Sequence, residues 1–300
     1  MIKLAVISAG SVLLFSAVLC ASSNPVLTHD RAFWQSIAKN HYSVPQGESA
    51  DALAPELSAL LGSPDPELRD DLAYSILAHW IYRNDLSTAA MTSLTDEWTS
   101  NLQIGLGESA TNSVLKRSFS ALCLSEIAKS EKRKPFLGRA RYQALLARAI
   151  SYLQAERDLR GYDEDLHWIH ATAHTADLLA ALAGSSMLTK EEAAAILRAV
   201  AARLSTAAQV YTQGEQDRLA AAVVAVVRRN DFERSNFDAW LAGIQLEDRD
   251  VWTATTLQNL VRYQNHQYLL QALTVRLLLE TPAQPLEAYR NEVLKVLAER

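Results

Sequence analysis

The chain has 300 residues, a formal net charge of −5 and an apolar fraction of 49%. A chain of this length and composition can bury a large core, which excludes a disordered or fibrous protein. It contains only 10 glycines and 8 prolines, and this scarcity favours helices over strands. Lysines and arginines are scattered rather than gathered in a stripe, so the charge pattern gives no support to nucleic-acid binding.

The first 23 residues have the pattern of a secretory signal peptide. Lys3 precedes an apolar run from Leu4 to Leu19, and small residues follow from Ala21 to Ser23. This order is typical of a cleaved signal, so we expect a periplasmic or secreted protein without a membrane span after cleavage. An uncleaved anchor is the alternative. The bulky Leu19 before Cys20 argues against lipid attachment at that cysteine.

Cleavage after Ala21 or Ser23 would leave Cys123 as the one cysteine of the mature chain. A single cysteine cannot form an internal disulfide, so stability must come from packing. Cys123 lies in the apolar helical pattern SFSALCLSEIA. We therefore expect a small buried side chain rather than a reactive thiol.

Apolar residues recur at helical spacing along the rest of the chain, and capping and breaking residues divide this pattern into segments. Asp65 with Pro66 begins one helix, and Thr189 with Glu192 forms a capping box. The predicted helices cover residues 30–41, 50–61, 66–83, 87–103, 111–130, 136–158, 168–182, 189–211, 214–229, 234–243, 250–280 and 285–299. We expect the long segment 250–280 to break near Asn265. No stretch alternates with a period of two between turn signals, the mark of strands.

These helices and their short linkers predict an all-α fold, an irregular α-solenoid of stacked helical hairpins similar to HEAT or armadillo repeats. The repeats are irregular because the sequence shows no clean repeat period. A compact α/α bundle is the alternative. No linker rich in proline, glycine or serine interrupts the mature chain, so residues 24–300 are predicted to form a single domain.

The most informative stretch runs from Asp158 to Leu182 and holds three of the seven histidines. Its sequence, preceded by ER, is DLRGYDEDLHWIHATAHTADLLAAL. The run resembles the signature of an uncharacterised bacterial family, a domain of unknown function with an RGY segment followed by W-x-H-x-x-x-H-x-x-D-L-L. Residues 116–122 (KRSFSAL) and 211–219 (YTQGEQDRL) are similar to two further blocks of that family.

The likeness extends loosely over about residues 70–280. His167 stands where the family pattern has glycine, which argues against a part for His167 in a shared site. The resemblance implies a helical-repeat fold and implies no activity.

His170 and His174 lie four residues apart, the spacing that lets two imidazoles bind one metal ion in zinc proteases. The glutamate of the protease motif is missing, because position 171 is alanine. Asp177 lies about 10.5 Å along the helix axis from His170, too far for both to reach one ion easily. A third ligand for a divalent metal would therefore come from elsewhere, and the candidates are Asp158, Asp163, Asp165 and Glu215.

A packing network is the structural alternative to a metal site. Gly161 is expected to allow a left-handed turn after Arg160, whose guanidinium could then bridge to Asp177 or cap a helix end. Glu215 and Arg218 lie one helical turn apart and form either an exposed pair or part of the same site.

We therefore predict an exported helical-repeat protein that binds a protein or small-ligand partner through residues 158–178. The alternative is a metal-dependent hydrolase that uses His170 and His174, and the sequence leaves open whether the protein is an enzyme. The candidate site residues are Asp158, Arg160, Trp168, His170, His174, Asp177, Glu215 and Arg218.

Overall fold

The computed structural model describes residues 28–280 and 284–300; the predicted signal peptide at residues 1–23 lies outside the described residues. The helices are α1 (Arg31–Lys39), α2 (Ala50–Leu60), α3 (Ser75–Arg83), α4 (Thr88–Asn101), α5 (Ser113–Arg133), α6 (Gly138–Ala155), α7 (Ala171–Ala183), α8 (Lys190–Thr206), α9 (Glu215–Val227), α10 (Arg234–Asp248), α11 (Leu257–Leu279) and α12 (Gln284–Ala298). A π-helical segment, η1 (Glu67–Tyr74), runs directly into α3. Two short strands, β1 (Tyr162–Asp163) and β2 (His167–Trp168), pair antiparallel.

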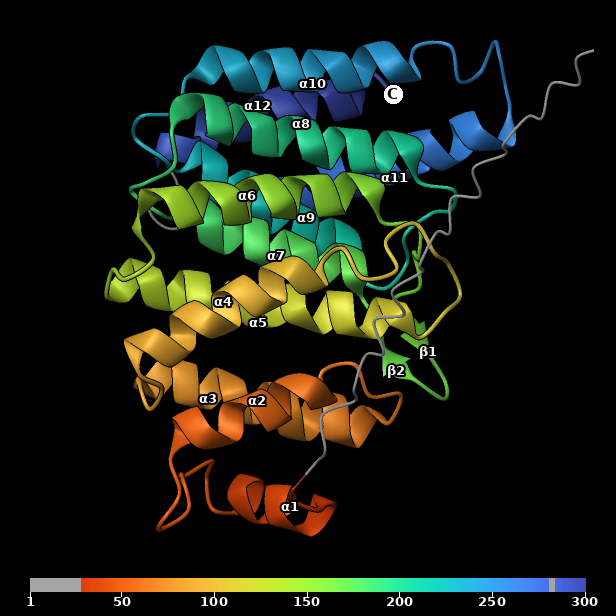
Figure 1. The fold of residues 1–300 in the computed structure, drawn as a ribbon. Coiled ribbons are helices and arrows are strands. Elements are labelled where there is room, and N and C mark those ends of the chain that lie inside the picture. Colours follow the sequence, from red (N-terminus) through yellow and green to blue (C-terminus); the bar gives the residue numbers. More distant parts are fainter. Residues whose placement is uncertain (1–27, 281–283) are drawn as a thin grey trace, which may run out of the picture.

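The helices stack in two rows (Figure 1). One row, here called row A, contains α3, α5, α7, α9 and α11, and the other, row B, contains α2, α4, α6, α8 and α10. Each helix contacts the next member of its own row and a partner in the opposite row, while α1 packs at one end and α12 against α10 and α11. This arrangement of sequential helical pairs confirms the predicted all-α fold of stacked hairpins.

Local sequence explains where many of these helices begin. The side chains of Asp30, Ser49, Ser87, Thr189 and Thr256 each accept a hydrogen bond from the backbone two or three residues into the following helix. These bonds satisfy amides that have no partner inside the helix. The predicted capping box of Thr189 and Glu192 is present.

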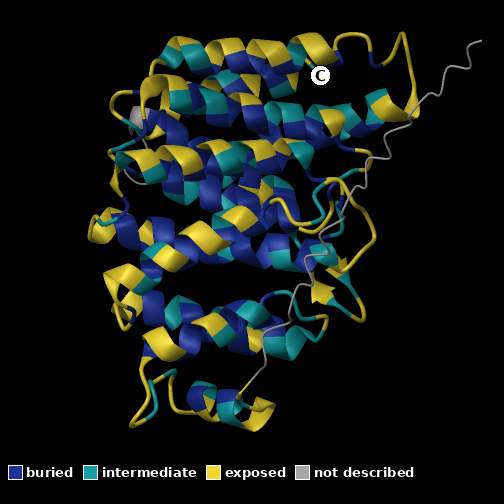
Figure 2. Cartoon of the chain, in the orientation of Figure 1, coloured by how far each residue is buried: buried dark blue, intermediate teal, exposed yellow. Residues whose placement is uncertain are grey.

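The core lies between the two rows, where buried residues face each other along the whole stack (Figure 2). Three tryptophans, Trp34, Trp80 and Trp98, are among its largest buried side chains. Cys123 is buried there as predicted, and burial raises the pKa of its thiol. Among the described residues, no helix combines the length and the apolar character that crossing a membrane requires.

Two predicted boundaries are wrong in a way that matters for the site. Helix α11 continues through Asn265 without a break, because the buried amide of Asn265 bonds a neighbouring loop instead of its own helix. Its Oδ1 accepts from Tyr211 N at 2.9 Å and its Nδ2 donates to Gln209 O at 3.1 Å. Helix α7 begins at Ala171 rather than at Trp168, because β2 occupies residues 167–168.

Candidate functional site

A β-hairpin over residues 162–168 lies directly before the N-terminus of α7, the middle helix of row A. Tyr162 pairs with Trp168 and Asp163 with His167. The turn between them is closed by Asp163, whose Oδ1 accepts from the backbone of Asp165 at 3.0 Å and of Leu166 at 2.9 Å. These hydrogen bonds lower the pKa of Asp163. Asp163 and Asp165 were predicted as metal-ligand candidates, but in the structure these hydrogen bonds give both residues a part in closing the turn.

Gly161 supports the hairpin for a different reason from the one expected. Its φ is not positive, and the left-handed residues are His167 (φ 56°) and His170 (φ 50°). A Cβ on Gly161 would overlap Gln213 Oε1 and would lie 2.5 Å from Glu215 Oε1 and 2.9 Å from Gln213 Cβ. A side chain at position 161 would therefore force the side chains of Gln213 and Glu215 to shift, which favours glycine there.

A buried arginine that the sequence did not single out, Arg69, ties the hairpin to η1. Its guanidinium donates to the backbone carbonyls of Ser63 (2.7 Å), Leu166 and Trp168 (3.2 Å). The same group lies over the ring of Phe119, with its Cζ 4.9 Å from the ring centroid. Arg69 therefore fixes the position of Trp168, although 99 residues separate the two in the sequence.

His170 contacts the segment before α9. Its Nε2 lies 2.9 Å from the carbonyl oxygen of Gln213 and 3.7 Å from Glu215 Oε1. Since a carbonyl oxygen can only accept, Nε2 carries a proton. The imidazole also stacks on Trp168, with ring centroids 4.5 Å apart, and burial lowers its pKa.

His174 is buried one helical turn further along α7. Its Nδ1 lies 2.8 Å from the hydroxyl of Ser118, which donates its proton to the carbonyl of Ile169. Because the hydroxyl has only one proton, Nδ1 of His174 must be the donor in the contact with Ser118. Burial lowers the pKa of His174 well below its usual value, so the ring is neutral near pH 7. Its Nε2 therefore carries no proton and can only accept a hydrogen bond.

Two ion pairs connect the neighbouring helices of row A. Arg218 NH1 lies 2.6 Å from Asp177 Oδ2, which joins α9 to α7. Arg276 donates to Asp217 at 2.8 and 2.5 Å, which joins α11 to α9. The predicted bridge from Arg160 to Asp177 is wrong, because Arg218 takes that carboxylate.

Arg160 pairs with Asp158 instead, at 2.7 Å. This pair holds the loop before α5: Asp158 Oδ2 accepts from Ala110 N and Arg160 NH2 donates to Thr111 O, both at 3.0 Å. Neither side chain lines the pocket described next, so these two candidates have a structural role in this fold.

Four of the remaining candidates line a pocket of about 360 Å³, here called the histidine pocket, whereas Asp177 and Glu215 do not. Its walls are Trp168, His170, His174 and Arg218, together with Gln213, Gly214, Asp217 and, from η1, Asp70. Asp70 was not predicted, and no local pattern marks it. Its half-buried carboxylate has no hydrogen-bond or ion-pair partner among the residues that the structure describes, and burial raises its pKa.

The geometry does not support the predicted metal site. Within residues 28–280 and 284–300, no group of three or more histidines, cysteines or acidic residues is arranged to hold a metal ion. Because His170 Nε2 donates to the Gln213 carbonyl and His174 Nδ1 to Ser118, each ring keeps one nitrogen lone pair, and two such nitrogens alone do not make a metal site. The metal-dependent hydrolase therefore lacks a third ligand beside its two histidines.

The chain matches the model of a protein family of unknown function, DUF2785, over residues 102–275. No curated protein and no solved structure gave a match to the chain. The matched region includes Trp168, His170, His174 and Arg218, while Asp70 lies before it. The match covers more than half of the sequence, and the chain belongs to the DUF2785 family.

Proposed function

We propose that the protein is an exported binding protein whose histidine pocket accepts a primary ammonium group. The observation that carries the proposal is the half-buried, unpaired carboxylate of Asp70 in the pocket wall. A carboxylate taken out of water without a partner is costly, and a cationic donor would remove that cost. The signal peptide predicted at residues 1–23 supports export.

A second acceptor supports the same ligand. The neutral ring of His174 can offer only the lone pair of Nε2, because Ser118 fixes the proton on Nδ1. An ammonium group has three donors and no acceptor. Asp70 and His174 together therefore suit an ammonium better than a carbonyl, a carboxylate or a phosphate.

Trp168 supplies an aromatic wall. Trp168 is 41% exposed, while Arg69 donates to its backbone carbonyl and His170 stacks on one face of its ring. The face of an indole ring attracts cations, an effect of about 0.5–2 kcal/mol depending on exposure. A pre-positioned ring contributes this attraction without a further loss of side-chain entropy.

The charges around the pocket are compatible with a cation. Arg218 is bound by Asp177, and the acidic Asp217 is bound by Arg276. Among the residues that line the pocket, this leaves Asp70 as the charged group without an ion-pair partner. The neutral state of both histidines near pH 7 adds no repulsion.

Isothermal titration calorimetry with n-butylammonium chloride tests the proposal, with n-butanol as the neutral probe of similar shape. We expect the full chain to bind the amine and not the alcohol. Asp70→Asn keeps the shape of the side chain and should weaken the binding at least about tenfold. Asp71→Asn, at the exposed neighbour on η1, is the matched control and should bind as the unchanged protein does.

Equal binding of amine and alcohol would contradict the proposal. So would an Asp70→Asn variant that binds the amine as well as Asp71→Asn does. Thermal unfolding of both variants checks that neither result reflects a loss of folding.

A further inference from the structure

The histidine pocket is one end of a stripe on a partly exposed face of row A. On α7 the stripe passes through His174, Asp177, Ala181 and Gly184, and these spacings of three and four residues keep one helix face. Arg218 begins the corresponding stripe on α9, which continues through Ala221, Ala225 and Arg228. The ion pair of Asp177 and Arg218 joins the two stripes, so both line the same surface.

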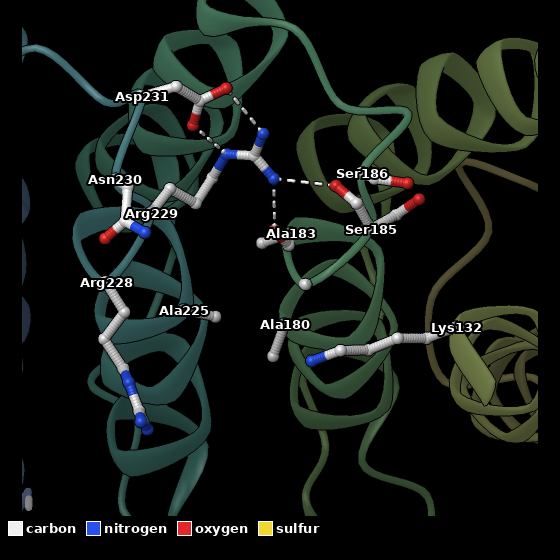
Figure 3. Close-up of a pocket in the computed structure, with 11 residues that line it drawn as sticks. Lys132, Ala180, Ala183, Ser185, Ser186, Ala225, Arg228, Arg229, Asn230 and Asp231 are labelled. Carbon is white, nitrogen blue, oxygen red and sulfur yellow. Dashed lines mark hydrogen bonds and ion pairs between the residues drawn. The ribbon is translucent and has the colours of Figure 1, made fainter.

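A second pocket, of about 690 Å³, lies at the opposite end of this stripe. Figure 3 shows its walls: Lys132 extends from α5 toward Ala180 of α7, and Arg228 lies across from it on α9. Small side chains, including Ala180, Ala183 and Ala225, make up much of the lining and leave the space open. We call this space the lysine pocket.

Lys132 differs from the two arginines that share the lysine pocket. Arg229 is held by Asp231 and by the carbonyls of Ala183 and Ser185, and Arg228 is paired with Glu280 at 2.5 Å. Lys132 has no hydrogen-bond or ion-pair partner in the described part of the chain, although its Nζ lies 3.2 Å from the position of a Cβ on Gly184.

The end of α7 does not use the Lys132 ammonium either. The carbonyl of Ala181 accepts from Gly184 N, that of Leu182 accepts from Tyr142 OH, and that of Ala183 accepts from Arg229. The last carbonyls of the helix are thus already bonded. The Lys132 ammonium remains available to an anion in the pocket.

The two pockets have opposite charges and lie at opposite ends of α7. His174 and Gly184 are ten residues apart on one helix, which corresponds to about 15 Å. An extended chain advances about 3.3–3.6 Å per residue, so four to five residues span this distance. The dipoles of α7 and α9 oppose this polarity, but salt and solvent screen such exposed helix termini, and the last carbonyls of α7 are already hydrogen-bonded.

We infer that the ligand is a short peptide of four to five residues with free termini, bound along the stripe between α7 and α9. Its N-terminal ammonium occupies the histidine pocket and its C-terminal carboxylate pairs with Lys132. The inference rests on the proposed function, which supplies the first of these two contacts. Between the ends, the alanines leave room for the peptide, and the Asp177–Arg218 pair offers an acceptor and donors to its backbone.

The experiment compares defined peptides by calorimetry on the full chain. The probes are pentaalanine, N-acetyl pentaalanine, pentaalanine amide and free alanine, with n-butylammonium as the reference. We expect pentaalanine to bind at least about tenfold more tightly than n-butylammonium. N-acetylation should abolish binding in the histidine pocket, and C-amidation should weaken binding about fivefold to tenfold because the Lys132 contact is lost.

The variants Lys132→Gln and Lys134→Gln locate the carboxylate contact. Lys132→Gln should weaken the binding of pentaalanine by the same factor as C-amidation does, and should leave the binding of pentaalanine amide unchanged. Lys134→Gln is the matched control, because Lys134 is exposed and does not line the lysine pocket. Both variants should unfold at the same temperature as the unchanged protein.

Three outcomes are decisive. If n-butylammonium binds through Asp70 but pentaalanine binds no more tightly, the peptide inference fails and the proposed function stands. Free alanine that binds as well as pentaalanine, and loses affinity in Arg218→Gln, would place a whole amino acid in the histidine pocket and also overturn the inference. Failure of n-butylammonium itself would overturn the proposed function.

Discussion

Nδ1 of His174 donates to the hydroxyl of Ser118 over 2.8 Å, and this one contact sets the chemistry of the ring. The hydroxyl donates its one hydrogen bond to the Ile169 carbonyl, so the imidazole takes the tautomer in which Nε2 has no proton. Ser118 thus connects α5, α7 and the end of the hairpin in a single chain of hydrogen bonds.

Removing this hydroxyl should destabilise the fold. Ser118→Ala leaves the buried Nδ1–H and the Ile169 carbonyl without a partner, which costs about 1–3 kcal/mol. Urea denaturation measures the loss in the free energy of unfolding. Ser100→Ala removes an exposed hydroxyl that donates to the Asp96 carbonyl within α4, and should change stability by less than about 0.5 kcal/mol. Equal effects of the two substitutions would contradict the assigned role of Ser118.

Gly161→Ala should also destabilise the fold, because its Cβ would meet the side-chain oxygens of Gln213 and Glu215. Overpacking of this kind costs about 1–3 kcal/mol. Gly243→Ala is the opposite case: Gly243 lies inside α10 with open space around it, so the alanine should stabilise the helix by about 0.5–1 kcal/mol. Thermal and urea unfolding of the two variants should therefore shift in opposite directions.

Stability should fall as the pH decreases below the ordinary histidine value. Burial lowers the pKa of both His170 and His174 in the folded chain. Below about pH 6.5 the unfolded chain takes up protons that the folded chain does not bind, so acid favours unfolding.

The pH dependence can be assigned by substitution. His174→Gln removes one such group, and should flatten the fall in the free energy of unfolding between about pH 7 and pH 5. Denaturation curves at each pH supply the measurement. His41→Gln, at an exposed histidine, should keep the slope of the unchanged protein. A His174→Gln variant with that same slope would show that His174 is not the titrating group.

Arg69→Met should release the hairpin while leaving the rest of the stack folded. The substitution removes the hydrogen bonds to Leu166 and Trp168 and leaves their carbonyls without this donor. Hydrogen exchange at the amide of Ile169, which donates to Gly161 O at 2.8 Å, should become faster than in the unchanged protein. Unchanged protection at Ile169 would contradict the anchoring role of Arg69. Binding of n-butylammonium should weaken at the same time, since Trp168 loses its fixed position.

Chelation should leave the folded state unaffected. Since no group of three or more potential ligands is arranged to hold a metal ion within residues 28–280 and 284–300, dialysis against EDTA is expected to change neither the melting temperature nor amine binding. A drop in the melting temperature that zinc reverses would restore the metal site that the sequence suggested.

Local features of the fold could be predicted from the sequence because they depend on neighbouring residues. The capping box at Thr189 and the burial of Cys123 follow from patterns a few residues long. The break expected at Asn265 is absent because the partners of this residue are distant in the sequence. Its amide finds partners at Gln209 and Tyr211, more than 50 residues away, and no local pattern reveals them.

The candidate site shows the same difference between local features, which the sequence predicts, and contacts between distant residues, which it does not. The spacing of His170 and His174 correctly placed both at one location, with Arg218 from a distant block beside them. It could not show that Ser118 fixes one imidazole, that Arg69 holds Trp168, or that Asp70 completes the wall. These residues enter through stacking of η1 and α5 against α7, a relation between helices that sequence periodicity does not specify.

The histidine pocket takes its walls from η1, α7 and α9, although α5 lies between η1 and α7 in the row. A guest in contact with both Asp70 and Arg218 would therefore span several successive steps of the stack. In a fold whose members touch only their neighbours, the small rotation between steps adds up to the bend of the whole array. A ligand that bridges these steps would hold the rotations between them at one value. Ligand binding in the histidine pocket would therefore change the distance between the two ends of the helical stack.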